Sequence, residues 1–288
     1  MKAIVLAAGL GSRLNPLTST RPKHLLPIAG KPILLKVLEA LYEAGIREVG
    51  LVVHYYEDKI RRIVGDGDFL GLKLTYIHQP ELNGTAGALE AARDYADNSD
   101  VVVIYGDVTV NGRVLKTLME RFQSENVDAA VVGVRVKNPR EFGVFELDGR
   151  YLKRVVEKPK RGEVRSNLIN TGVYAFTPKV FEALNMIDVS PRGEKELTDA
   201  LQILASSGRV LVVDCGEGWW FDIGRPWDLL DANKAELSRV ENTLIMSEVL
   251  PGVRVIGDVV VGKDTEIMPG AVLVGPSYIG SNVKIGYN

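Results

Sequence analysis

A repeat of six residues runs through the last part of the chain and constrains its fold more than any other feature. One hydrophobic column, spaced by six, consists of Val249, Val255, Val261, Ile267, Leu273, Ile279 and Ile285. A second column of smaller residues consists of Val253, Val259, Thr265, Ala271, Ser277 and Val283. This period is typical of a parallel β-helix, in which each repeat places one short strand on a face of a triangular coil. We therefore predict a β-helix over residues 246–288, truncated because the repeat still runs where the chain stops.

Short apolar segments alternate with helical patterns from the start of the chain to about residue 135. Strands are expected at 3–6, 49–53, 72–77, 101–105 and 129–136. Apolar residues recur at helical spacing from Ile33 to Ala44, after Pro32 and before Gly45, and similar patterns predict helices at 87–95 and 114–122. This alternation is typical of an α/β domain with helices on both faces of its sheet.

After about residue 140 the expected strands are shorter, at 143–147, 152–156 and 172–176, with one more before Trp219. A helix is expected at 194–205, and another at 226–237 begins with Pro226, which suits a first helical position. We expect this half to cap the sheet. The sequence thus predicts an α/β domain over residues 1–235 that precedes the β-helix.

The composition excludes several classes of function. With 288 residues, 46% of them hydrophobic, the chain can bury one large core and a smaller one. A formal net charge of -2 offers no basic field, so neither nucleic acid nor a membrane is an expected partner. The single cysteine, Cys215, and three scattered histidines fit neither a disulfide framework nor a structural zinc site. Without a signal peptide or membrane span, we expect a cytoplasmic protein that binds a small ligand.

Directly after the first expected strand comes the segment Leu6-Ala7-Ala8-Gly9-Leu10-Gly11-Ser12-Arg13-Leu14. Small residues allow backbone N–H groups to approach an anion. Dinucleotide-binding folds begin similarly, but their third glycine would fall on Leu14, and no acidic residue ends the second strand. The P-loop motif of NTPases is also missing from the sequence. Because Arg13, Arg21 and Lys23 accompany the loop, we expect it to bind a triphosphate.

Several further motifs occur in the same order as in a known family. They are Arg21-Pro22-Lys23, Gln79-Pro80, Gly84-Thr85-Ala86-Gly87, Gly106-Asp107, Phe142-Gly143-Val144, Glu157-Lys158-Pro159, Asn170-Thr171-Gly172 and Trp220-Phe221-Asp222-Ile223-Gly224. With them the chain resembles the nucleoside-diphosphate-sugar pyrophosphorylases, which are sugar-1-phosphate nucleotidyltransferases. It is most similar to archaeal-type members that carry a left-handed β-helix, and segments 191–194 and 197–199 resemble glucose-1-phosphate thymidylyltransferases. The resemblance implies a Rossmann-like mixed sheet followed by a left-handed β-helix.

Two aspartates are the candidate metal ligands. Asp107 and Asp222 each follow an apolar segment, and Asp107 is expected at the carboxyl edge of the sheet, where α/β folds bind ligands. The resemblance implies that both bind one Mg²⁺, an ion that prefers hard oxygen ligands. The competing interpretation of each is an aspartate that caps a turn or a strand end.

The resemblance also assigns roles to cations and to the sugar pocket. Arg13 and Lys23 are the implied catalytic residues, which hold the triphosphate and stabilise the leaving pyrophosphate. Sugar-phosphate contacts are implied for Gly143, Glu157, Lys158, Asn170, Arg192 and Trp220. For Glu157 and Lys158 the competing interpretation is a solvated charged pair.

Nucleotide contacts are implied for Leu6, Ala8, Gly9, Gly11, Ser12, Arg13, Gln79, Gly84 and Thr85. A glutamine amide such as Gln79 offers one donor and one acceptor, which suits uracil or thymine better than guanine. Gly84 would let the base approach the backbone, or it is a glycine required at a helix entry. The expected nucleotide is therefore dTTP or UTP, and the sequence does not choose between them.

The expected reaction joins dTTP or UTP to glucose 1-phosphate, a hexose 1-phosphate. A close alternative is N-acetylglucosamine-1-phosphate uridylyltransferase, one half of a bifunctional enzyme whose acetyltransferase site would be missing with only about two β-helical coils present. An inactive sensor or assembly subunit is another alternative, against which the retained cations and carboxylates argue. We also expect a homo-oligomer, because an uncapped coil leaves backbone groups unpaired.

Overall fold

The described part of the chain divides into two compact units. The computed structural model describes residues 1–190, 193–216 and 219–287. The first unit contains Met1–Leu25 and Ile33–Gly224, and the second contains Leu26–Pro32 and Arg225–Asn288. The boundary expected near residue 235 falls at the end of helix α8 (Pro226–Leu237), which belongs to the second unit.

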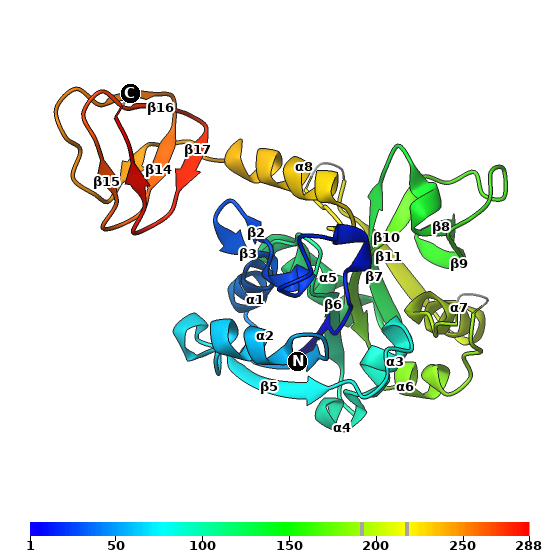
Figure 1. Cartoon of the computed structure of the whole chain (residues 1–288). Coiled ribbons are helices and arrows are strands. Elements are labelled where there is room, and N and C mark those ends of the chain that lie inside the picture. Colours follow the sequence, from blue (N-terminus) through cyan, green and yellow to red (C-terminus); the bar gives the residue numbers. More distant parts are fainter. Residues whose placement is uncertain (191–192, 217–218, 288) are drawn as a thin grey trace. The chain divides into compact units, whose positions relative to one another are not determined.

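A mixed sheet, nine-stranded within the described residues, organises the first unit (Figure 1). Its strands are β1 (Lys2–Ala7), β4 (Glu48–Val53), β5 (Lys73–His78), β6 (Val101–Tyr105), β7 (Ala129–Arg135), β8 (Gly143–Asp148), β9 (Tyr151–Glu157), β10 (Leu168–Phe176) and β11 (Val210–Asp214). They lie in the order β5-β4-β1-β6-β10-β7-β11-β9-β8. β1 is parallel to β4 and β6, whereas β10 is antiparallel to β6 and β7.

The expectation that the second half caps the sheet was wrong, because its strands extend the same sheet. β10 inserts between β6 and β7. All nine of its residues are buried. A strand buried on both faces needs ladder partners on both edges, and only a central position in the sheet provides them.

Helices cover both faces of the sheet, as the alternating pattern predicts. They are α1 (Ile33–Glu43), α2 (Glu57–Val64), α3 (Thr85–Glu90), α4 (Arg93–Ala96), α5 (Gly112–Glu125), α6 (Lys179–Leu184) and α7 (Leu197–Ser207). The helix expected at 87–95 is divided into α3 and α4. Helix α2 was not predicted from the sequence, because it is a charged helix that buries only Ile60 and Val64. Among the described residues, no helix has both the length and the apolar character that a membrane span needs.

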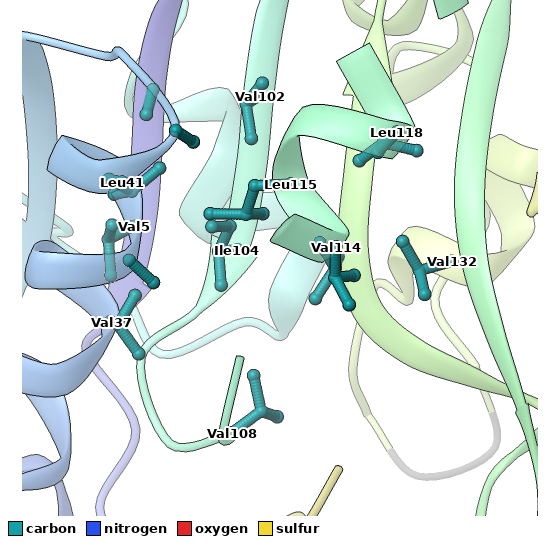
Figure 2. Packing of buried hydrophobic residues seen from close by; sticks show 14 of the residues in the cluster. Val5, Val37, Leu41, Val102, Ile104, Val108, Val114, Leu115, Leu118 and Val132 are labelled. Carbon is teal, nitrogen blue, oxygen red and sulfur yellow. The ribbon is translucent and has the colours of Figure 1, made fainter. Parts of the chain in front are cut away.

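Alternating residues of β1 supply two separate cores. Val5 belongs to the cluster that α1, α2 and α5 cover, whereas Ile4 belongs to the cluster beneath α3, α6 and α7. Figure 2 shows Leu41 of α1 and Leu115 of α5 among the side chains that pack over Val5 and Ile104. This two-sided packing fixes β1 and β6, whose carboxyl ends carry the candidate site.

The hexapeptide region forms a short left-handed β-helix. Its strands are β12 (Leu244–Ile245), β13 (Arg254–Ile256), β14 (Val259–Val261), β15 (Glu266–Ile267), β16 (Val272–Val274), β17 (Ser277–Ile279) and β18 (Lys284–Ile285). Val255 pairs with Leu273 and Val261 with Ile279, each eighteen positions along the chain, so three repeats make one coil. The predicted column is buried at Val261, Ile267 and Leu273. Val255, in the same column, keeps 37% exposure.

A hairpin from the first part of the chain packs with the second unit. It consists of β2 (Pro27–Ile28) and β3 (Lys31–Pro32), and the turn residues Ala29 and Gly30 both have positive φ. The Ala29 N–H donates to Oδ1 of Asn233 in α8 over 2.8 Å. A Cβ on Gly30 would lie 2.1 Å from the ring of Tyr278, so the aromatic ring lies directly against this glycine. No local pattern around residues 26–32 indicates this pairing.

Leu115 tests the core that supports β1 and β6. We expect Leu115→Ala to destabilise the first unit by about 2–5 kcal/mol, because it leaves a cavity between α5 and the sheet. Lys116→Ala, at the exposed neighbouring position, should change the free energy of unfolding by less than about 0.5 kcal/mol. Urea denaturation followed by tryptophan fluorescence measures both values, and equal stabilities for the two variants would contradict this packing.

Candidate active site

The glycine-rich segment lies at the carboxyl end of β1, where the sequence predicts it. β1 pairs with β6 so that Leu6 lies opposite Tyr105. The N–H of Gly106, the next residue, donates to the Leu6 carbonyl over 2.9 Å. The glycine-rich loop and Asp107 therefore leave neighbouring strands at the same edge of the sheet.

The loop packs closely against Lys23. Gly11 has a φ of +67°, and a Cβ there would lie 3.0 Å from Cβ of Lys23. A Cβ on Gly9 would lie 3.4 Å from Cε of the same lysine. Glycine at these positions lets the lysine side chain run along the loop, which brings a cation to the backbone groups expected to bind phosphate.

Residues from the start of α2 hold the segment that joins the loop to Lys23. The Thr18 hydroxyl donates to the Gly11 carbonyl over 2.9 Å. The Tyr56 hydroxyl donates to the Ser19 carbonyl over 2.7 Å, and the Lys59 ammonium bonds the Thr20 carbonyl. Tyr56 itself has a φ of +51°, a strained conformation that places its ring toward this segment's carbonyls. This support was not predicted from the sequence, because nothing in the spacing of the residues links the two segments.

Backbone pairing brings the two candidate metal ligands together. Val108 and Asp222 form an antiparallel β-bridge. The Ile223 N–H donates to the Asp107 carbonyl over 3.0 Å, and the Thr109 N–H donates to the Phe221 carbonyl over 2.9 Å. Asp107 and Asp222, more than one hundred residues apart in sequence, are therefore held on adjoining segments.

The Thr109 side chain reinforces this pairing. Its hydroxyl donates to the Trp219 carbonyl over 3.1 Å and accepts from the Phe221 N–H over 2.8 Å. Thr109 is 8% exposed, so both backbone groups would lose a partner in a site with little water if the hydroxyl were removed. Sequence reasoning did not identify Thr109, because its partner segment is distant in sequence.

Asp107 forms a largely buried ion pair with Lys23. The Lys23 ammonium donates to Oδ2 of Asp107, and the two side chains are 17% and 11% exposed. Burial alone would raise the pKa of Asp107, but the charge and hydrogen bond of Lys23 hold that pKa below its ordinary value. The carboxylate is therefore ionised at neutral pH.

His24 adds an uncharged group beside this pair. It is 1% exposed, and burial together with the Lys23 charge lowers its pKa to about 3. The imidazole is therefore neutral at physiological pH. Its Nδ1 has no hydrogen-bond partner among the described residues, and the sequence analysis did not assign it a role.

A bulge in β10 shapes the other end of the site. Its register against β7 shifts between Asn170 and Tyr174, and Gly172 within the bulge has a φ of +77°. The Asn170 amide donates to the Tyr174 hydroxyl over 2.7 Å, and the Thr171 carbonyl accepts from the Trp220 indole over 2.9 Å. The motif 170–172 therefore turns backbone and amide groups out of the ladder and toward the site.

Glu157 lies beside this bulge. The Thr198 hydroxyl is 3.3 Å from Oε2 of Glu157, and a Cβ on Gly143 would lie 3.0 Å from the same oxygen. Lys158 Nζ is 3.9 Å from Oε1 of Glu157 and 46% exposed, so the pair is a loose one. Carboxylate, hydroxyl, amide and backbone groups thus converge here, the set that hydroxyl-rich ligands require.

Gln79 and Gly84 mark the segment expected to contact the base. Gln79 is 2% exposed, and its amide nitrogen donates to the Glu81 carbonyl over 2.8 Å. Gly84 has a φ of +104°, and a Cβ there would lie 2.4 Å from the Lys195 carbonyl oxygen. The glycine is thus required by the close approach of Lys195 at the entry to α3, which was the competing interpretation of this residue.

One cavity of about 450 Å³ joins these groups. It is lined by the predicted residues Leu6, Ala8, Gly9, Gly11, Ser12, Arg13, Lys23, Gln79, Gly84, Thr85, Asp107, Gly143, Glu157, Lys158, Asn170, Trp220 and Asp222. Arg192 lies outside the described residues. The lining also contains His24, Tyr105, Glu141, Glu194, Glu196 and Thr198, which were not predicted as site residues. The volume and the mixture of charges suit a nucleotide with a sugar phosphate.

The two aspartates fit a divalent ion of the magnesium type. Both line the cavity, and backbone pairing holds their segments together. Two carboxylates leave most of an octahedral shell to phosphate oxygens and water, as Mg²⁺ usually requires. Among the described residues, no group of three or more His, Cys, Asp or Glu side chains is placed to form a protein-only metal cage.

Thr109 provides a test of the segment pairing. We expect Thr109→Val to destabilise the protein by about 1–3 kcal/mol, because two buried backbone groups lose their partner. Thr109→Ser keeps the hydroxyl and should recover most of that loss. Thermal unfolding of the three proteins measures the difference. A valine variant as stable as the parent would show that the hydroxyl does not support the pairing.

Comparisons with known proteins agree with this geometry. The nucleotidyl transferase family model matches residues 2–239, and the six-repeat bacterial transferase hexapeptide model matches residues 258–288. A glucose-1-phosphate thymidylyltransferase from Streptomyces griseus is 39% identical over 99% of this chain and 79% of its own. A bifunctional sugar-1-phosphate nucleotidylyltransferase/acetyltransferase from Sulfurisphaera tokodaii is 36% identical over 93% of this chain and 63% of its own.

Several relatives are longer than this chain, and solved structures share its fold. The chain spans 66%, 63% and 60% of the length of three of the relatives it matches. A crystal structure assigned as a glucose-1-phosphate thymidylyltransferase from Bacillus anthracis, in complex with sucrose, superposes with a TM-score of 0.75. It is 31% identical, and the match covers 81% of this chain and 94% of that one. The chain belongs to the nucleotidyl transferase family and joins its nucleotidyltransferase domain to a hexapeptide-repeat β-helix.

Proposed function

We propose that this protein is a magnesium-dependent sugar-1-phosphate nucleotidyltransferase. It transfers a nucleotidyl group from dTTP or UTP to glucose 1-phosphate and releases pyrophosphate. The observation that carries the proposal is that Lys23, Arg13, Asp107 and Asp222 line the same cavity. Family membership and the relatives' names support the same reaction class.

The reaction needs positioning and charge neutralisation more than proton transfer. A phosphate monoester has a second pKa of about 6, so the attacking phosphate is mostly dianionic at neutral pH without a base. Its oxygen attacks the α-phosphorus while pyrophosphate leaves on the opposite side. The site must therefore bring two anionic substrates together against their mutual repulsion.

Positively charged side chains at two places in the cavity would offset the repulsion between the two anionic substrates. The Lys23 side chain lies along the glycine-rich loop and the Arg13 guanidinium lies against Gly224, and both line the cavity, where they would hold the triphosphate and stabilise the pyrophosphate. Lys158, beside Glu157 in the same cavity, would hold the sugar phosphate. Asp107 and Asp222 would bind Mg²⁺, which when bound neutralises charge on the phosphate oxygens.

Polar groups at the β10 bulge would bind the hexose. Asn170 and Glu157 supply an amide and a carboxylate at the cavity wall, and Gly143 exposes backbone beside them. The Tyr174 hydroxyl accepts from the Asn170 amide and so fixes how this side chain is turned. Directional groups held in this way favour a hydroxyl-rich ligand.

The base site offers an acceptor for uracil or thymine. Because the two hydrogens of the Gln79 amide nitrogen are used by the Glu81 carbonyl and by Oδ1 of Asn83, the amide oxygen is the group that this side chain can offer to a base. Uracil and thymine carry one ring N–H between two carbonyl groups, and this N–H can donate to that oxygen. The two bases differ by one methyl group, and the two nucleotides differ further by one 2′-hydroxyl group, so the enzyme is expected to accept both dTTP and UTP to some extent.

The closest alternative substrate is N-acetylglucosamine 1-phosphate with UTP. The relative from Sulfurisphaera tokodaii supports this alternative, because its name combines a sugar-1-phosphate nucleotidylyltransferase with an acetyltransferase. An inactive sensor on the same fold is disfavoured because the cations and carboxylates share one cavity. An activity assay separates these three functions directly.

The decisive test is pyrophosphate release from each pairing of dTTP, UTP, ATP and GTP with several sugar 1-phosphates, with and without Mg²⁺. We expect activity with dTTP or UTP that depends on the metal. Asp222→Ala should abolish it, and Lys23→Ala should lower kcat by about 10²–10³-fold because charge on the leaving group loses its partner. Lys116→Ala, on the exposed face of α5, is the matched lysine control and should remain active.

Normal turnover by both Asp107→Ala and Asp222→Ala would overturn the metal assignment. No pyrophosphate release from any substrate pair, with nucleotide binding retained, would favour the sensor. Preference for N-acetylglucosamine 1-phosphate with UTP would replace glucose 1-phosphate as the substrate while leaving the reaction class intact.

A further inference from the structure

The Lys23–Asp107 ion pair occupies a carboxylate that a metal ion would also bind. The Lys23 ammonium bonds Oδ2 of Asp107, the carboxylate that the proposed function assigns to the metal. Neither side chain is more than 17% exposed, so water screens their interaction only weakly. A divalent ion that binds Asp107 must therefore compete with a cation that the chain itself supplies.

The path of the lysine side chain shows where else its ammonium can go. Cβ of Lys23 lies against Gly11, and its Cε and Nζ lie 3.4 and 3.5 Å from the Cβ position of Gly9. The side chain thus lies along the loop expected to hold the triphosphate. The lysine side chain has about four rotatable bonds, so its ammonium group can move from the carboxylate to a phosphate without a change in the backbone.

Asp107 lies in a buried environment, where a carboxylate without a positive partner is unfavourable. The Asp107 residue is 7% exposed, and its neighbour His24 is 1% exposed. A buried carboxylate without a counter-ion is costly, so Asp107 needs either the lysine or a metal at all times. The triphosphate attracts the lysine and, through its own oxygens, the metal, so both changes favour the same exchange.

We infer that Lys23 is an exchangeable counter-ion, which occupies Asp107 until a nucleoside triphosphate draws it away and a divalent cation takes its place. This inference rests on the proposed function, since it assumes that Asp107 binds the catalytic metal. Lys23 thereby makes nucleotide and metal binding cooperative, and the coupling is reciprocal. The protein alone holds the metal weakly, and the protein with nucleotide holds it tightly.

If Lys23 is exchanged in this way, one substitution should raise the affinity for Mn²⁺ and lower the affinity for dTTP. Lys23→Met removes the competing charge, so the nucleotide-free protein should bind Mn²⁺ more tightly by about tenfold or more. The same variant lacks a cation for the triphosphate, so in saturating Mn²⁺ it should bind dTTP more weakly by about tenfold or more. A lysine that only contacts phosphate would change the second affinity and leave the first unchanged.

Electron paramagnetic resonance of free Mn²⁺ measures the first affinity, and calorimetric titration with dTTP, without any sugar phosphate, measures the second. Lys158→Met is the matched control, because Lys158 lines the same cavity but its ammonium lies beside Glu157, 3.9 Å away. It should tighten Mn²⁺ binding much less than Lys23→Met. Lys23→Arg keeps the charge and should retain the weak Mn²⁺ binding of the parent. Adding Asp107→Asn to Lys23→Met should remove the gain, and circular dichroism checks that every variant is folded.

The outcomes separate the inference from the function beneath it. Equal Mn²⁺ affinities in the parent and Lys23→Met, with dTTP binding weakened, would overturn the counter-ion and leave the enzyme assignment standing. An equal gain in Lys158→Met would also overturn it, because a general field effect would then explain the result. If Mn²⁺ bound to no variant even with dTTP present, the proposed metal site itself would be wrong.

Discussion

The antiparallel pairing of residues 107–109 with residues 221–223 is the constraint on which the candidate site depends. Two backbone hydrogen bonds and the Thr109 hydroxyl hold these segments together, and each segment carries one carboxylate into the cavity. β6 brings the first segment to the sheet edge beside the glycine-rich loop. Without this pairing, Asp107 would still face Lys23, but the chain would have no second ligand beside it.

The sequence predicted those features whose physical cause is local. A period of six gave the β-helix because every coil repeats the same small and apolar positions, and eighteen-residue pairing follows from three repeats per coil. Glycines directly after two expected strands predicted where those strands end. Because parallel neighbouring strands end at the same edge of a sheet, the glycine-rich loop after Leu6 and Asp107 were predicted at one edge. The assignment of individual residues, such as Arg13 and Trp220, came from resemblance to a family rather than from spacing.

Other features depend on partners that no local pattern reveals. Thr109, Tyr56 and Lys59 act through hydrogen bonds to distant backbone, so their own neighbours in sequence give no sign of a role. The second half joined the sheet instead of capping it, because β10 needs a ladder on both edges. Cavity residues such as His24 and Glu196 were missed for a related reason, as burial depends on the whole fold.

We predict one metal ion shared by Asp107 and Asp222, two acids that are far apart in sequence. Crystals soaked with Mn²⁺ and dTTP test this most directly, because anomalous scattering locates the ion independently of the protein. A single peak within about 2.0–2.3 Å of both Asp107 and Asp222 carboxylate oxygens is the predicted result. A peak bound to neither carboxylate, or two peaks on separate surfaces, would contradict the shared site.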